Sequence, residues 1–297
     1  MNNPSSHRKP AHLMRQLRKP FEIAAATLAF AILPRLPRPA IVHLSRFLGR
    51  AAYLFSAKQR RIGRANLDLV YRDTLSSRQK NTLLIRSLQT FALAILDSLW
   101  FSRHSHARLQ RWITMDPGYD PLLEPRRALC ITAHMGSWEA IGLALSARGV
   151  SLSSIANPLK NPQVNRHFVE KRKVTGQQVI PRAGAARGIL KELREERKVA
   201  LVLDQNVLLS EGGIFIDFFG LPVTASPIAG ALALKTDTPI VLGFCLPDPR
   251  GHYHCIPPTW IYPADLTPDP HPPHPAAALT RHIYRIFEQT ILAHPHA

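Results

Sequence analysis

The period of the hydrophobic pattern changes after about residue 111, and the change predicts two differently built regions. Between residues 58 and 111, apolar residues recur every three or four positions, which is typical of amphipathic helices. Thr74 and Ser76 stand before one of these stretches as helix-start residues. The first third of the chain is therefore expected to be helical.

From Ala128 onward, short apolar runs alternate with helical stretches. The runs are ALCITA, SLSSIAN, QQVIPR, VALVLDQN and PIVLGFCLP, and helices are expected at 139–147, 163–175, 185–197, 227–235 and 279–293. Strands that alternate with helices of this length build βαβ units. The predicted class is α/β, with a mainly parallel sheet flanked by helices. The predicted organisation is a helical N-terminal region, 1–111, followed by an α/β core, 112–297.

Positive charge is concentrated in the N-terminal region. Residues 1–111 hold 20 of the 38 Lys and Arg residues but only four of the 20 acidic ones, so nearly all of the net charge of +18 lies there. This concentration of positive charge predicts a polyanionic partner. The candidates are a nucleic acid, an anionic membrane surface and an acidic protein.

The segment 21–55 favours a membrane surface over nucleic acid. Its apolar stretch 21–33 follows a basic flank but is shorter than the ~20 residues of a bilayer span. No cleavable segment follows it, as it would in a signal peptide. A helix lying in the interface, with its arginines at the lipid phosphates, suits this length and charge. The alternative is a buried core helix with a solvated basic tail. Nucleic acid is disfavoured because the basic residues are interleaved with aliphatic rather than aromatic side chains.

A candidate catalytic pair follows the first apolar run of the core. His134 stands directly after ALCITA, and Glu139 comes five residues later. In a parallel α/β sheet, sites form at the carboxyl ends of strands, and Gly136 and Ser137 suit a turn that caps the next helix. The carboxylate would orient the imidazole, which would take a proton from a hydroxyl near neutral pH. By itself, this spacing also fits two structural residues.

Metal or cofactor chemistry is not expected. The cysteines Cys130, Cys245 and Cys255 form no CxxC motif and suit a reduced core. No zinc-ligand spacing occurs. The Pro- and His-rich stretch 262–276 is expected to be a surface loop, because its prolines prevent a compact ligand cage.

Several sequence blocks, in order, resemble a known family. They are RRIGRANLDLVY, AHMGSWE, NPLKNPQVNRHFVEKRKVTG, and LDQN followed by GGIFIDFFGLPVTASPIAGALALKTDTPIV. From about residue 21 to about 295 the chain is similar to the late acyltransferases of lipid A biosynthesis, the lauroyl and myristoyl transferases, within the glycerolipid acyltransferase superfamily. One departure is Ser137, where Asn is usual.

The resemblance implies roles for individual residues. His134 would be the general base and Glu139 its partner, while Arg172 would bind or polarise substrate. Asp204 and the Phe218-Phe219-Gly220 turn match blocks that line the site. Structural alternatives stay open: Arg172 would pair only with Glu170, Asp204 would only cap a strand end, and the two phenylalanines would pack. Arg166 and Lys173 share the expected helix of Arg172 and would add cations for acceptor phosphates.

The implied function is acyl transfer without metal or cofactor. A fatty acyl group would move from a thioester on acyl carrier protein to a hydroxyl of a lipid A precursor, an anionic lipid, at the cytoplasmic face of the inner membrane. One alternative is another lipid acceptor, a lysophospholipid or an aminolipid. A further alternative is a catalytically silent membrane-surface protein.

Overall fold

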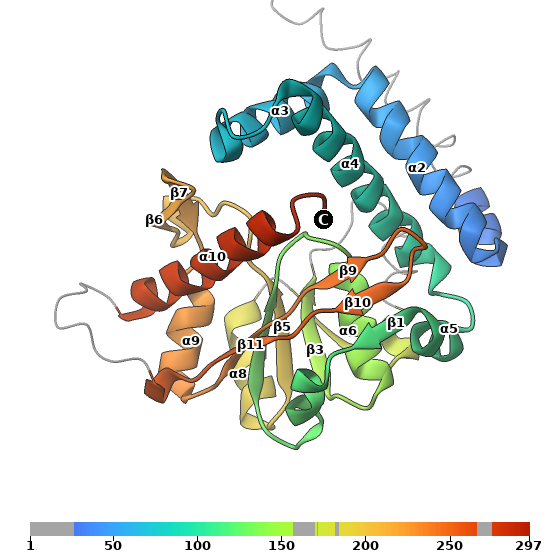
Figure 1. Ribbon diagram of the computed structural model, residues 1–297. Helices are drawn as coiled ribbons and strands as arrows, with labels where there is room; N and C mark the ends of the chain where they lie inside the picture. The colour runs from blue at the N-terminus through green and yellow to red at the C-terminus, as the bar shows by residue number, and fades with distance from the viewer. Residues whose placement is uncertain (1–26, 157–169, 171, 182–183, 266–274) are drawn as a thin grey trace, which may run out of the picture.

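The computed structural model of the protein describes residues 27–156, 170, 172–181, 184–265 and 275–297 (Figure 1). The described part of the N-terminal region is helical, as its hydrophobic period predicts. It comprises a helical stretch at 27–32, η1 (Leu33–Arg35), α2 (Arg38–Phe55), α3 (Ala57–Tyr71), α4 (Ser77–Trp100) and α5 (Ser105–Trp112). Ser56 and Ser76 cap α3 and α4 with their hydroxyl groups. The expected membrane-associating segment 21–55 begins outside the described residues.

The central sheet has six strands in the order β11-β8-β2-β5-β3-β4. The bounds of these strands are β2 (Ala128–Thr132), β3 (Leu152–Ala156), β4 (Gln178–Pro181), β5 (Lys198–Val202), β8 (Ile240–Leu242) and β11 (Thr259–Ile261). Neighbouring strands run parallel from β8 to β4, whereas β11 runs antiparallel to β8. This sheet carries the candidate site at the carboxyl ends of β2 and β5.

Two smaller sheets complete the fold. One has the order β1-β10-β9, with β1 (Ile113–Met115), β9 (Cys245–Pro247) and β10 (Tyr253–Cys255), and the other is the hairpin β6 (Ile214–Phe218) and β7 (Leu221–Ala225). The α/β class is as predicted, but the sheets are mixed, and the prediction of a mainly parallel sheet is not confirmed. The reason lies in the connection between β6 and β7 and in those after β8, which are too short to hold the crossover helix that a parallel pair needs.

The apolar run PIVLGFCLP predicts a single strand, but the structure divides it into two. The chain leaves the central sheet after β8 and enters the small sheet as β9. Between them, Gly243 packs so closely on Tyr119 that a Cβ atom would lie 2.5 Å from its hydroxyl. The turn therefore requires glycine at this position.

Helices cover both faces of the central sheet. They are α6 (Trp138–Ala147), α8 (Ala185–Arg194), α9 (Ile228–Thr236) and α10 (Pro275–Ala293). Short 3-10 turns lie in the connections, namely η2 (Pro117–Leu123), η3 (Leu209–Glu211) and η4 (Pro263–Asp265). Of the expected helix 163–175, the structure describes 170 and 172–175, and among these 170 and 172–174 are helical. Most of the expected loop 262–276 lies outside the described residues.

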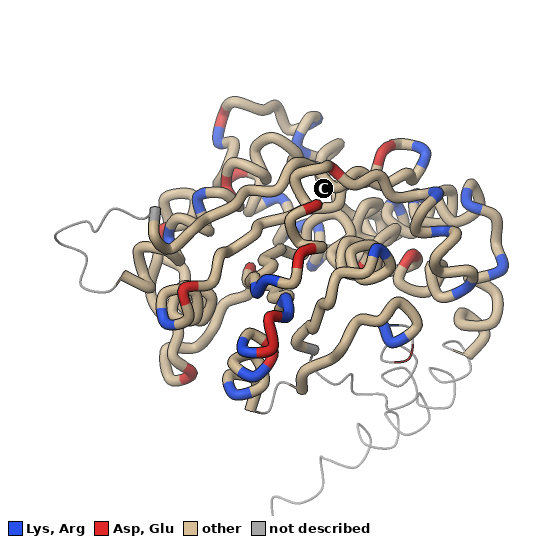
Figure 2. Tube along the Cα trace, turned by 90° about the horizontal axis from the view of Figure 1, so that it is seen from below, with Lys and Arg blue, Asp and Glu red and all other residues tan. Residues whose placement is uncertain are grey.

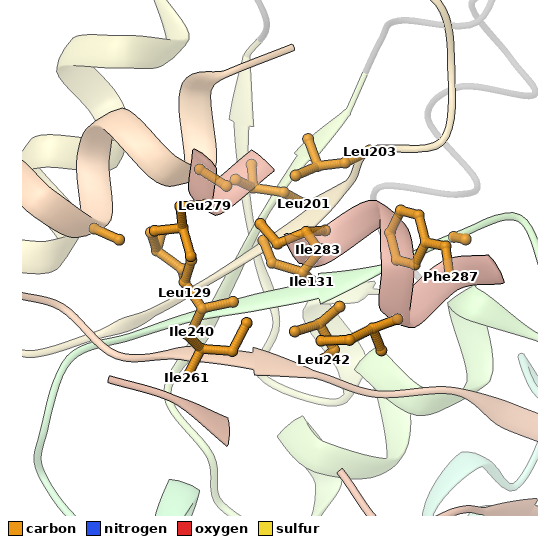
Figure 3. Packing of buried hydrophobic residues seen from close by; sticks show 14 of the residues in the cluster. Leu129, Ile131, Leu201, Leu203, Ile240, Leu242, Ile261, Leu279, Ile283 and Phe287 are labelled. Atoms are coloured by element: carbon orange, nitrogen blue, oxygen red, sulfur yellow. The ribbon is translucent and has the colours of Figure 1, made fainter. Parts of the chain in front are cut away.

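The alternation of side chains along the strands builds two cores. Leu129 and Ile131 face α9 and α10, where they join Leu242 and Phe287 in one buried cluster (Figure 3). The opposite cluster contains residues of β2, α6, α4 and α2, among them Ala128, Leu143, Leu93 and Ile41. The N-terminal helices therefore share a core with the sheet. The three cysteines are free, and Cys245 and Cys255 are buried, as expected of reduced core residues.

A buried ion pair joins α2 to the rest of this second core. Arg38 and Asp97 form a bidentate pair whose side chains are only 2% and 0% exposed. Tyr253 of β10 donates a hydrogen bond to the same carboxylate at 2.8 Å, and the guanidinium also donates to the carbonyl of Gly251. The guanidinium stacks over Trp100 at 4.8 Å from its ring centroid. One cation thus ties α2, α4 and the β9–β10 turn together.

We expect Asp97→Asn to lower the free energy of unfolding by about 3–5 kcal/mol, because it leaves the buried Arg38 without a counter-charge. Asp120→Asn serves as the control, since Asp120 pairs with Arg148 at the surface and such exposed pairs contribute less than ~1 kcal/mol. Urea denaturation followed by circular dichroism measures both variants. Equal losses in the two variants would contradict the assigned role of the buried pair.

Candidate active site

A clamped turn after β2 projects His134 from the edge of the sheet. Gly136 adopts a φ of +57°, and a Cβ atom there would lie 2.1 Å from the carbonyl oxygen of Cys245, so only glycine fits. The next residue, Ser137, donates its backbone N–H to that same carbonyl at 2.8 Å and caps α6 with its hydroxyl. The turn is thus held to β9 on one side and to α6 on the other.

The partner of the His134 ring is Asp204. Strands β2 and β5 pair in parallel with Thr132 opposite Val202, so His134 and Asp204 each stand two residues beyond a paired position. The carboxylate accepts the backbone N–H of His134 at 3.1 Å and lies 2.8 Å from its Nδ1. Because an ionised carboxylate only accepts hydrogen bonds, Nδ1 carries the proton and Nε2 is left with a free lone pair in the neutral ring.

The surroundings of His134 favour its protonated form. The hydrogen bond to Asp204 raises the pKa of His134 above its ordinary value, burial opposes this effect, and the negative charges of Asp204 and Glu139 add to it. An imidazole in this setting holds a proton more firmly once it has taken one.

Glu139 does not take the position next to the imidazole that its spacing predicts. It lies in the first turn of α6 and binds Arg172 in bidentate fashion, with N–O distances of 2.5 and 3.3 Å. Its charge still acts on His134, but the oriented contact belongs to Asp204. The physical reason is that the register of β2 and β5 brings Asp204 to Nδ1, while α6 directs Glu139 toward the segment before β4.

The other predicted substrate-binding residues do not all lie next to the Glu139–Arg172 ion pair. Glu170 pairs with Lys173 at 3.0 Å rather than with Arg172, and the Lys173 side chain is 62% exposed. Arg166 lies outside the described residues. The structure therefore brings together His134, Asp204, Glu139 and Arg172, and leaves Lys173 at the surface.

Aromatic side chains that the sequence analysis did not single out support the site. Trp138 packs edge-on against the His134 ring at 4.6 Å, and Phe91 of α4 lies 6.2 Å from Trp138. Tyr284 of α10 donates to the carbonyl of Leu203, next to Asp204, at 2.5 Å, and burial raises the pKa of Tyr284 to about 12. Trp138 stands inside the AHMGSWE block, whereas nothing local in the sequence marks Phe91 or Tyr284.

The Phe218-Phe219-Gly220 turn is a packing element of the β6–β7 hairpin. Phe218 packs edge-on against Tyr284 at 5.4 Å. Phe219 adopts a φ of +53°, and its backbone N–H donates to the carboxylate of Glu288. The hairpin is thus anchored to α10, next to the residue that supports Asp204.

A cavity runs from the ion pair into the space between the sheet and α6. It encloses about 640 Å³, counted to its open end, and its walls are largely apolar. They include Leu122, Ile131, Ile141, Leu145, Leu152 and Val241, with Trp138, Glu139 and Arg172 among the remaining lining residues. A largely apolar lining with a few polar groups is typical of sites for apolar ligands. Among the described residues, no group of three or more His, Cys, Asp or Glu side chains could hold a metal ion.

The hydrogen bond to Asp204 predicts a shifted titration of His134. We expect its midpoint, measured by NMR on the ring protons, to lie above the ~6.5 of a free histidine and to fall in Asp204→Asn, where the carboxylate charge is lost. The spectrum of His134→Ala assigns the signal. Asp120→Asn is the control, and a midpoint that is equal in Asp204→Asn and wild type would contradict the prediction.

Comparison with known proteins places the chain in a family. The family model described as bacterial lipid A biosynthesis acyltransferase matches residues 12–297. The chain is also 31% identical, over 177 residues, to the phosphatidylinositol mannoside acyltransferase of Mycobacterium tuberculosis strain H37Rv, covering 57% of this chain and 51% of that protein. It is 28% identical to the protein of the same name from Mycolicibacterium smegmatis, covering 52% of each. The chain thus matches about half the length of these relatives. With nearly its whole length matched by the family model, it belongs to the bacterial lipid A biosynthesis acyltransferase family.

Proposed function

We propose that the protein transfers a fatty acyl group from a thioester to a hydroxyl of a lipid acceptor at a membrane surface. The observation that carries this proposal is the His134–Asp204 pair, which leaves Nε2 of the ring free as a base. The cavity beside Glu139 and Arg172 supports it, because it offers an apolar space next to these polar groups. Family membership and the names of the relatives support the same chemistry.

In the proposed mechanism, Nε2 of His134 removes the proton of the acceptor hydroxyl as its oxygen attacks the thioester carbonyl carbon. Asp204 holds the Nδ1–H and stabilises the imidazolium cation that forms. The tetrahedral intermediate then collapses, the carbon–sulfur bond breaks, and the leaving thiolate takes the proton back from the imidazolium. An ester and a free thiol result, and His134 returns to its neutral form.

We propose that Glu139 acts through Arg172. The carboxylate neutralises and orients the guanidinium, which keeps N–H groups to donate to an oxyanion or a phosphate oxygen. Glu139 is therefore a positioning residue, and Arg172 is the group that would touch substrate. Arg166 and Lys173 stay predicted contacts for acceptor phosphates.

The proposed donor is acyl carrier protein, and the proposed acceptor is a lipid A precursor. Carrier proteins are acidic, and the basic N-terminal helices would attract them. In the right-hand half of Figure 2, Lys and Arg positions outnumber Asp and Glu positions, on the side where α2 and α5 lie in Figure 1. The relatives favour a second acceptor, a phosphatidylinositol mannoside, by their names. Both acceptors are phosphorylated glycolipids with free hydroxyl groups.

We propose that the protein works on the cytoplasmic face of the inner membrane. Large apolar side chains of α2 face solvent, with Phe47 66%, Leu54 64% and Phe55 87% exposed. Such a surface suits a helix lying in the lipid interface. By length and composition, α4 is the one helix in the described part of the chain that is long and apolar enough to cross a bilayer. In its most apolar stretch, 39% is buried inside the protein. Core helices of soluble proteins meet the same criterion, so the proposal of surface contact rests on the exposed apolar face of α2.

We expect His134→Ala to lower the rate of acyl transfer by ~10²–10⁴-fold, the usual range for loss of a general base. Asp204→Asn should lower kcat strongly, and Glu139→Ala should remove most of the activity through Arg172. Asp120→Asn is the control, because Asp120 pairs with Arg148 at the surface and belongs to none of the proposed contacts. Circular dichroism establishes folding. Near wild-type transfer by His134→Ala would overturn the proposed mechanism.

The acceptor is tested with a panel read by mass spectrometry. Acyl carrier protein and coenzyme A thioesters are combined with a lipid A precursor, a phosphatidylinositol mannoside, a lysophospholipid, an aminolipid, and dephosphorylated glycolipids. We expect phosphorylated glycolipids to be preferred, and Arg172→Lys to lower their use, since lysine cannot reproduce a bidentate contact. Lys191→Arg, on the exposed side of α8, is the control. Equal use of all acceptors with Arg172→Lys fully active would point to a different lipid.

A further inference from the structure

A second cleft, which contains no residue of the His134 site, lies between α2 and the β9–β10 turn. It measures about 1280 Å³, counted to its open mouth, and is lined by residues of both elements and by the end of α5. The residues that matter for its chemistry are His43, Arg46, Arg250, His252 and His254. Cationic and titratable groups therefore dominate its wall.

The charge of the cleft is not cancelled by its own acidic residue. Among the lining residues, Asp248 is the one carboxylate, and it accepts the backbone N–H groups of Arg250 and His252 at 2.8 Å each. The Asp248 carboxylate is therefore engaged in hydrogen bonds that stabilise the β9–β10 turn. Arg38, at the base, is paired with Asp97, while Arg46 and Arg250 bring the positive charge. An anion that enters the cleft meets a net positive wall.

The wall of the cleft is tied in place by hydrogen bonds from three elements. The Arg46 guanidinium donates to the carbonyl of Pro249 at 2.6 Å, which holds the turn against α2. Thr114 of β1 lies 2.8 Å from Nε2 of His252, and the rings of His252 and His254 are 4.9 Å apart. Arg46 and the two histidines are therefore set in a defined arrangement rather than on a loose loop.

The faces of α2 indicate what reaches this cleft. With 100° between successive residues, Arg46 and His43 lie on the side of the helix between its buried face and its exposed apolar face. The buried face includes Ile41 and Ser45, and the exposed apolar face carries Phe47 and Leu54. If the apolar face enters the lipid interface, the cleft stands at the level of the lipid phosphates.

We propose that this cleft binds the phosphate of an anionic phospholipid headgroup. Guanidinium groups are suited to phosphate oxygens, and the adjoining apolar face of α2 supplies the place for the acyl chains of the same lipid. The proposal rests on the membrane association within the proposed function, but it does not depend on acyl transfer. Its ligand is a phosphate group carried by a lipid rather than a free phosphate ion.

The test measures binding of the full chain to vesicles of phosphatidylcholine alone and of phosphatidylcholine with phosphatidylglycerol. The variant is Arg250→Gln with His254→Gln, and the control is Arg194→Gln with His282→Gln, two exposed residues on α8 and α10. For the anionic vesicles we expect about fivefold weaker binding by the cleft variant, since the loss of one Lys or Arg near the surface costs about 1 kcal/mol. Binding to phosphatidylcholine and binding by the control variant should stay within about twofold of wild type.

Several outcomes would overturn the proposal. They are wild-type binding by the cleft variant, an equal loss in the control variant, and full competition by soluble glycerol 3-phosphate at a concentration equal to that of the lipid phosphate, which would assign the cleft to a free phosphate. Vesicle binding is measured without an acyl donor, so a failure of acyl transfer would overturn the proposed function and leave this result standing. Conversely, turnover on detergent-dispersed acceptor should be equal in the cleft variant and the wild type.

Discussion

The buried pair of Arg38 and Asp97 is the interaction on which the arrangement of the molecule depends. It fixes α2 against α4 and, through Tyr253 and Gly251, fixes both helices to the small sheet. A charge buried to this extent is tolerated only with a complete set of partners, so α2 has one favourable position on the core. That position sets both the exposed apolar face of α2 and the cleft beside it. The same α4 carries Phe91 over Trp138, and so reaches the His134 ring.

The candidate chemistry depends on a second constraint, the parallel register of β2 and β5. Because the two strands end at the same level, the residues that follow them meet across the sheet edge, and Asp204 receives both the backbone and the ring of His134. The pair is flanked by Trp138 of α6 and by Tyr284 of α10, and it stays about one third exposed. Glu139 and Arg172 form a separate ion pair at the mouth of the apolar cavity. The site thus combines a base on one side with a cation on the other.

These two constraints connect chemistry with location. Under the proposed function, a lipid acceptor leaves the bilayer far enough to bring a hydroxyl to Nε2 of His134, which requires the enzyme to sit at a fixed height on the membrane. In the functions proposed here, the apolar face of α2 supplies the anchor and the cationic cleft supplies the contact at the phosphates. Helix α4 packs Phe91 near Trp138 and is joined by the Arg38–Asp97 pair to α2, which carries the surface proposed to face the membrane. A shift of α2 would therefore change both the proposed membrane contact and the packing around His134.

Short-range patterns in the sequence determined the helices, the parallel strands of the central sheet, the Ser76 cap and the place of His134 at a strand end, because these depend on residues within a few positions of one another. They did not mark β1, β6, β7, β10 or β11. The tertiary structure decided which carboxylate meets His134: Asp204 is 70 positions away and arrives through strand register, which no local spacing records. The pairing of Arg38 with Asp97, 59 positions apart, could likewise not be predicted from local sequence patterns. The same holds for the break at Gly243, where packing on Tyr119 rather than propensity divides one apolar run between two sheets. Local periodicity reports which face of an element is buried, whereas the choice of partner is set by how distant elements pack.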